Sequence, residues 1–234
     1  MRLIDEKAFL FILLLVSLSF CSCMMNDSIP QSIMGEDNKL ENIDISVLEK
    51  EESNIDKQLR ASNGYVIAEF LLQILLKETV NDTERAIVFS NLPDLDWKAL
   101  DLYSRDNKQY LDDNACFILV NWLYSVVPDM KEKEKLTTMQ ATLGLDGVYS
   151  ESFAGLMVQI FEKDRIGFFQ LVSKIDQIKN AEQTVILLAN GCSYKSDEEI
   201  KQIEIELIEY ITSPELSFLD KHWISLFLDR LVKL

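Results

Sequence analysis

The sequence predicts an all-α protein of about ten helices, arranged as a helical bundle or as a HEAT-like stack of antiparallel helix pairs. Apolar residues recur with the period of an amphipathic helix along most of the chain. Among the 234 residues there are only seven glycines and four prolines, which is few for a protein made of strands and turns. Neither Asn63-Gly64 nor Asn190-Gly191 separates two alternating apolar runs, as a β-hairpin would require.

The first part of the predicted domain contains three apolar stripes. The clearest apolar stripe is that of the second helix, which Ser62 or Asn63 can cap, and a less regular stripe precedes it. Pro93 separates the second helix from a third, which Asp94 or Asp96 can cap. The three stripes are Ile43, Val47, Leu48, Ile55 and Leu59; Val66, Ile67, Phe70, Leu71, Ile74 and Leu75; and Trp97, Leu100 and Tyr103.

The next pattern is apolar on most sides, so we expect a central helix with Trp122 buried on it. Asp112 and Asp113 precede this helix and suit its N-terminus, where unpaired N–H groups favour negative charge. Pro128 ends it. Its apolar residues are Cys116, Phe117, Leu119, Val120, Trp122, Leu123, Val126 and Val127.

Short local signals mark the remaining helices. We expect Ser150 or Ser152 to open one helix, Asp164 to cap a short one, and Asn190-Gly191 to end another. Ser196 and Glu199 fit a capping box, and Ser213-Pro214-Glu215 can start the last helix with proline at the tolerated first position. The helix after Ser196 carries the stripe Ile200, Ile203, Leu207, Ile208 and Ile211, and the last helix carries Leu216, Leu219, Trp223, Phe227, Leu228 and Leu231.

The N-terminal stretch 8–23 has no charged residue and follows Arg2 and Lys7. A short apolar segment behind basic residues, closed by small residues, is typical of a secretory signal. The stretch falls short of the roughly 20 apolar residues that a membrane-spanning helix needs, although an uncleaved anchor helix is the alternative interpretation.

The end of this stretch, Leu18-Ser19-Phe20-Cys21-Ser22-Cys23, resembles the lipobox of bacterial lipoproteins. In that family an apolar residue and two small residues precede the cysteine that is acylated. With Cys23 as acceptor, Cys21 and Ser22 are the small residues, and Phe20 stands where the family usually has leucine. With Cys21 as acceptor, Phe20 would occupy a small-residue position, so we prefer Cys23.

The resemblance implies cleavage before Cys23 and attachment of acyl chains such as palmitate to its thiol and new amino group. Two or more chains hold a protein firmly on a membrane, because each buried CH₂ contributes about 0.8 kcal/mol. The predicted organisation is therefore a signal peptide at 1–22, a flexible polar tether at 23–42, and one all-helical domain at 43–234. The expected location is the cell envelope, outside the cytoplasm and anchored to the membrane.

The formal charge of −16 disfavours nucleic acid and anionic lipid surfaces as partners. Solubility is one explanation of this charge, and attraction of a basic protein partner is a more specific one. Aromatic residues can supply contact anchors, although we expect most of them in the core. The aromatic candidates are Trp97, Tyr103, Tyr110, Trp122 and Trp223.

No pattern for a cofactor or a metal site is visible. The domain contains only Cys116, expected to be buried in an apolar run, and Cys192, which follows Gly191 near a predicted helix end and can be exposed. Sequence alone does not pair these two cysteines. His222 is the only histidine, no nucleophile motif accompanies it, and we expect it at the surface.

One segment resembles fragments of the lytic transglycosylases, helical enzymes in which a catalytic glutamate precedes serine and a glycine-leucine-methionine-glutamine segment follows. Glu151-Ser152, then Gly155-Leu156-Met157 and Gln159-Ile160, carry the resemblance. Only two residues separate the elements here, where the family has a longer stretch, and Val158 interrupts the second. An amphipathic helix with Leu156, Met157 and Ile160 in the core accounts for the same residues.

The sequence thus predicts a lipid-anchored, acidic, all-helical protein-binding module of the bacterial cell envelope, without catalysis. An inhibitor or immunity protein that blocks a basic toxin or enzyme is one alternative. A peptidoglycan enzyme similar to the lytic transglycosylases, with Glu151 as its catalytic residue, is the other.

Overall fold

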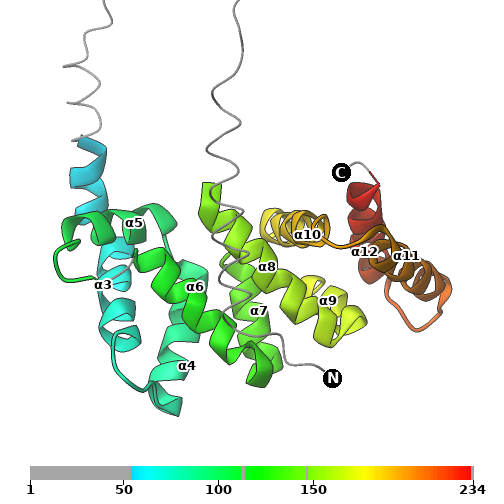
Figure 1. Cartoon of the computed structure of the whole chain (residues 1–234), viewed down its shortest axis with the longest axis horizontal. Coiled ribbons are helices and arrows are strands. Elements are labelled where there is room, and N and C mark those ends of the chain that lie inside the picture. Colours follow the sequence, from blue (N-terminus) through cyan, green and yellow to red (C-terminus); the bar gives the residue numbers. More distant parts are fainter. Residues whose placement is uncertain (1–53, 112–113, 146, 233–234) are drawn as a thin grey trace, which may run out of the picture. The chain divides into compact units, whose positions relative to one another are not determined.

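The computed structural model describes residues 54–111, 114–145 and 147–232, and within them it confirms the all-α fold, with no β-strand (Figure 1). These residues belong to one compact unit, 45–234. The predicted signal peptide at 1–22, the tether at 23–42, the lipidation site Cys23, and Asp112 and Asp113 lie outside the described residues.

A helix covers residues 54–60 at the beginning of the described part. The helices that follow are α3 (Asn63–Leu75), α4 (Asp82–Asn91), the 3₁₀ helix η1 (Leu92–Asp94), α5 (Trp97–Asp106), α6 (Ala115–Val126), the 3₁₀ helix η2 (Val127–Asp129), α7 (Glu132–Gln140), α8 (Gly147–Lys163), α9 (Arg165–Val172), α10 (Ile178–Cys192), α11 (Asp197–Thr212) and α12 (Phe218–Leu231).

Most helix starts follow from a local cap. The side chains of Ser62, Asp96 and Asp164 accept hydrogen bonds from the backbone N–H groups at the starts of α3, α5 and α9, as the sequence predicts. Two predicted starts are wrong. Helix α8 begins at Gly147, so Ser150 and Ser152 lie inside it, and α12 begins at Phe218 behind Ser217 instead of at Ser213-Pro214.

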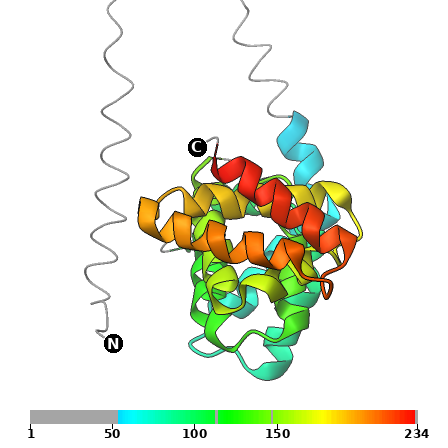
Figure 2. The ribbon, with the colours of Figure 1, turned by 90° about the vertical axis from the view of Figure 1, so that its right-hand side faces the viewer.

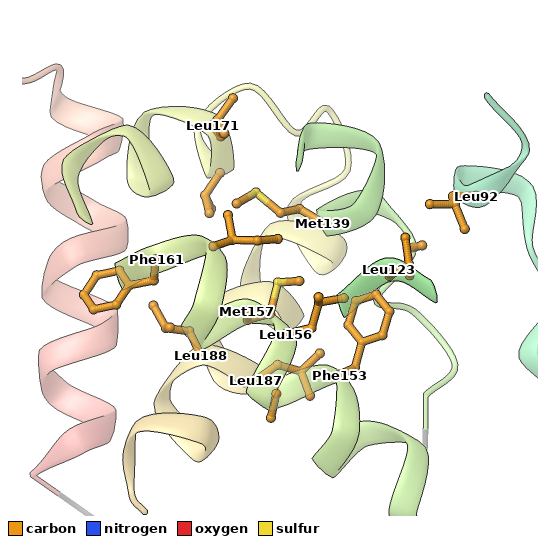
Figure 3. Close-up of a cluster of buried hydrophobic side chains, with 14 of the residues drawn as sticks. Leu92, Leu123, Met139, Phe153, Leu156, Met157, Phe161, Leu171, Leu187 and Leu188 are labelled. Atoms are coloured by element: carbon orange, nitrogen blue, oxygen red, sulfur yellow. The ribbon is translucent and has the colours of Figure 1, made fainter. Parts of the chain in front are cut away.

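Helix α8 is the centre of the core (Figure 3). It packs most extensively on α10 and also contacts α6 and α9. Its large buried side chains are Phe153, Leu156, Met157, Ile160 and Phe161. The Phe161 ring lies beside the rings of Phe168, Phe169 and Phe227, with centroids 5.6–5.9 Å away, and so joins α8 to α9 and α12.

Helix α6 packs against α3, α5 and α8, which agrees with its expected central place. Trp122, however, is only partly buried, so the prediction that it is a core residue is wrong. Its ring lies against Phe89, with 5.4 Å between the centroids. The buried side of α6 is formed instead by Ala115, Cys116, Leu119, Val120 and Leu123.

Gly191 does not end a helix as predicted, because α10 continues to Cys192. A Cβ atom at Gly191 would lie 2.6 Å from the carbonyl oxygen of Ala154 and 2.6 Å from Cγ2 of Val158. The glycine therefore allows α10 to approach α8 closely.

Successive contacts lead through the fold from α3 to α11. Helix α3 packs on α5 and α6, α6 on α8, α8 on α10, α10 on α12, and α12 on α11. Helix α11 has its main contact with α12, and Figure 1 shows it at the right-hand edge of the described unit. The described helices consequently leave one side of α11 uncovered.

Candidate binding surface

Helices α11 and α12 each begin at a reciprocal cap. At the start of α11, Ser196 Oγ accepts from the Glu199 N–H at 3.3 Å, while the Glu199 carboxylate accepts from the Ser196 N–H at 3.0 Å. That backbone hydrogen bond is the main cause that lowers the pKa of Glu199. Ser217 and Asp220 form the same arrangement at α12, and Asp220 also accepts a hydrogen bond from Ser173.

The inner side of α11 is fixed by apolar packing and by one ion pair. Ile203 and Leu207 are buried. Glu206 lies 2.6 Å from Arg165 of α9, and Arg165 also pairs with Glu162 at 3.2 Å. These contacts set the rotation of α11 about its axis, and therefore determine which residues it exposes.

Figure 2 shows α11, coloured orange, on the side of the unit that faces the viewer. The outer side of this helix combines apolar and acidic residues. Ile205 and Ile208 are 47% and 56% exposed. At 100° per residue, they lie on the side opposite the buried Ile203 and Leu207. We define the outer α11 face by the residues that share this side, which are Glu198, Lys201, Gln202, Ile205, Ile208, Glu209 and Thr212, all of them exposed.

Most of the acids of α11 are not neutralised. The helix contains six acidic residues and one lysine, Lys201. Glu206 pairs with Arg165, and Glu199 lies 3.9 Å from Lys195. No salt bridge within 4.0 Å joins the other four to any residue that the structure describes; they are Asp197, Glu198, Glu204 and Glu209.

Two large apolar side chains are also exposed at the start of α12. Phe218 is 88% exposed, the highest value among the large apolar residues that the structure describes, and the neighbouring Leu219 is 42% exposed. Only residues 213–217 separate Phe218 from the end of α11. Ile208 and Leu219 belong to the apolar stripes predicted from the sequence, but both are exposed.

A second candidate site is a cavity of about 300 Å³ between helix 54–60, α5 and the start of α8. Three of the four charged side chains that line it bind one another. Asp101 lies 3.3 Å from Arg105 and accepts a hydrogen bond from the Tyr149 hydroxyl at 3.1 Å, while Arg105 lies 3.6 Å from Asp56. Burial is the main cause that raises the pKa of Tyr149. This network explains the cavity as a structural feature.

The residues of the predicted transglycosylase resemblance lie together on α8. Glu151 is exposed and does not line the cavity, whereas Leu156, Met157 and Ile160 are buried in the core. Gly155 faces the Tyr124 hydroxyl, which donates a 2.7 Å hydrogen bond to the Ser152 carbonyl. Helix packing therefore accounts for the glycine and for the apolar residues of this segment.

The other candidate residues are distributed between surface and core. His222 is exposed on α12, with its ring 4.8 Å from that of Trp223. Of the predicted aromatic anchors, Tyr110 is exposed, Tyr103 and Trp122 are partly buried, and Trp97 and Trp223 are buried.

Both cysteines of the described part are buried, so the expectation that Cys192 can be exposed is wrong. Burial raises the pKa of the Cys192 thiol to about 12. No disulfide joins Cys116 to Cys192.

Comparison with known proteins gives no assignment. No protein-family model matches the chain, and neither a curated protein nor a solved structure matches it significantly. Among the helices of the described residues, none is both long enough and apolar enough to span a membrane. Within the same residues, no group of three or more His, Cys, Asp or Glu side chains is placed to hold a metal ion.

Proposed function

We propose that the chain is a lipid-anchored, acidic, protein-binding module of the bacterial cell envelope, that it has no catalytic role, and that its partner is a basic protein. The observation that carries this proposal is the outer α11 face, where Ile205 and Ile208 are exposed beside acids without a salt-bridge partner among the described residues. An exposed apolar strip bordered by charge is typical of protein contact surfaces.

The position of the acids on α11 supports a basic partner more specifically than the net charge of the whole chain does. At physiological ionic strength, charges are screened beyond about 8 Å. A partner that contacts Ile205 and Ile208 is therefore attracted mainly by nearby acids such as Glu204 and Glu209. Such acids increase the association rate more than they slow dissociation.

The proposed anchor is supported by the sequence at the N-terminus. Cys21 and Ser22 occupy the small-residue positions before Cys23. Acylation of Cys23 would tether the domain at the membrane through residues 24–42. The non-catalytic role is supported by the exposure of Glu151 on α8 and by the absence of a nucleophile motif around His222.

Site-specific photocrosslinking in cells tests the proposal. A photoreactive residue at Ile208 of the full-length chain should capture a partner, whereas the same residue at Val66 of α3, which is 59% exposed, should not. The partner should be basic, and its association rate with the purified protein should fall about tenfold or more between low and physiological salt. An acidic partner, or equal capture at both positions, would contradict the proposal.

A further inference from the structure

The backbone of α11 offers no hydrogen bonds to a partner at its outer face. Its N–H and C=O groups are bonded within the helix, and the described residues contain no β-strand whose edge could accept another strand. Contact at this face is therefore made by side chains alone. A partner segment that covers Ile205 and Ile208 loses water from its own backbone, and must satisfy those backbone groups internally.

An α-helix meets this requirement, because all of its interior backbone groups are paired within the segment. The pattern on α11 also defines the sides of such a helix. Glu204 lies one turn before Ile208, and Glu209 lies one turn after Ile205, so acids border the apolar strip on both sides. The complementary surface is an apolar stripe with lysines or arginines along each edge.

We infer that the partner presents a cationic amphipathic α-helix that lies along the outer α11 face, with its apolar stripe on Ile205 and Ile208. This inference rests on the proposed function. A helix of 16 residues such as α11 is about 24 Å long, which provides room for several turns of the partner. Phe218 is a further exposed apolar side chain, and it follows the C-terminal end of α11 after residues 213–217.

Charge excludes a second copy of this chain as the occupant. Two α11 helices placed face to face would bring Glu198, Glu204 and Glu209 of each copy together, with one lysine on each side to oppose them. Like charges at a contact are unfavourable and suppress association. A partner helix rich in lysine or arginine reverses the sign of each of these interactions.

Lys201 provides a specific way to test the electrostatic attraction between the outer α11 face and a basic partner helix. It is the only cation on the outer α11 face, and it lies one turn from Ile205. Lys201→Glu removes a repulsion and adds an attraction for a basic helix. The matched control is Lys57→Glu, which makes the same charge change on helix 54–60; Figure 1 shows that helix at the opposite side of the unit from α11.

The experiment uses the full-length protein in nanodiscs of zwitterionic lipid, with empty nanodiscs as the reference. The probe is a peptide of about 18 residues in which leucines repeat at helical spacing and lysines border them. A second peptide has the same residues in an order that does not separate leucines from lysines. Biolayer interferometry then gives association and dissociation rates for both peptides.

The amphipathic peptide should bind about tenfold more tightly than its scrambled isomer. Ile205→Ser with Ile208→Ser should abolish this difference, chiefly through faster dissociation, whereas Val66→Ser with Phe70→Ser, a matched exposed pair on α3, should preserve it. Lys201→Glu should increase the association rate about threefold, and Lys57→Glu should leave it nearly unchanged.

Equal affinity for the two peptides would overturn the inference. So would an unchanged difference in the Ile205 and Ile208 variant, because the peptide would then bind elsewhere. Neither result affects the proposed function, which depends on the crosslinked partner and on its charge. Conversely, an acidic partner captured at Ile208 would refute the basic partner and this inference together.

Discussion

Replacement of Gly191 by alanine tests the closest helix contact in the core. The added Cβ would lie 2.6 Å from the Ala154 carbonyl oxygen, whereas real Cβ contacts essentially never fall below 3.0 Å. A backbone oxygen cannot swing away, so α8 and α10 must separate. Alanine gains at most about 1 kcal/mol over glycine in a helix, and overpacking costs about 1–3 kcal/mol. We expect Gly191→Ala to lower the free energy of unfolding by about 1–2 kcal/mol.

Gly155→Ala is the matched control for this prediction. Its Cβ would meet the Tyr124 hydroxyl, which is the end of a side chain and can rotate away. The cost is then mainly the 2.7 Å hydrogen bond from Tyr124 to the Ser152 carbonyl, about 1 kcal/mol. Urea unfolding followed by far-UV circular dichroism measures both variants. A Gly191→Ala protein as stable as the wild type, or more stable, would refute the close approach of α8 and α10.

Phe161→Ala should lower the free energy of unfolding by about 3–5 kcal/mol in the same assay, and Trp122→Ala should lower it clearly less. The reason is that Phe161 is fully buried while Trp122 remains partly in water. Equal losses in the two variants would contradict this prediction. The hydrogen bond from Arg60 holds the pKa of Asp106 below its usual value, so the pair stabilises the fold above about pH 4 and this contribution disappears as the pH falls further. The stability deficit of Asp106→Asn should accordingly vanish in acid, and a deficit independent of pH would argue against the ion pair as its cause. Mass spectrometry should find an acylated Cys23 at the mature N-terminus, and retention of residues 1–22 would contradict the proposed anchor.

Helix starts were predictable where a cap depends on a few consecutive residues. Ser62, Asp96, Asp164 and Ser196 all cap the helices expected from the sequence, because each hydrogen bond spans only two or three residues. The start of α12 was missed because Pro214 gave a stronger local signal than the capping pair Ser217 and Asp220.

Features that depend on the packing of distant helices could not be predicted in this way. In sequence, Asn190-Gly191 matches the pattern of a helix C-cap. Only the position of Ala154 on α8 reveals that Gly191 allows the two helices to pack closely. Periodicity likewise shows which side of a helix is apolar, but not how much of that side a neighbour covers. Val66, Phe70 and Ile208 belong to predicted stripes and are nevertheless exposed, because no described helix covers that part of α3 or α11.

The same distinction explains why the charge of −16 did not by itself locate a binding surface. Much of the acidity serves the fold. The carboxylates of Glu84 and Glu199 accept hydrogen bonds at helix starts, Glu134 pairs with Arg85 at 2.8 Å, and Asp106 pairs with Arg60 at 2.7 Å. Acids used in this way are partly neutralised and attract a partner only weakly. On α11, by contrast, Glu204 and Glu209 have no such role and border two exposed isoleucines, so this face combines both the attraction and the apolar contact that binding requires.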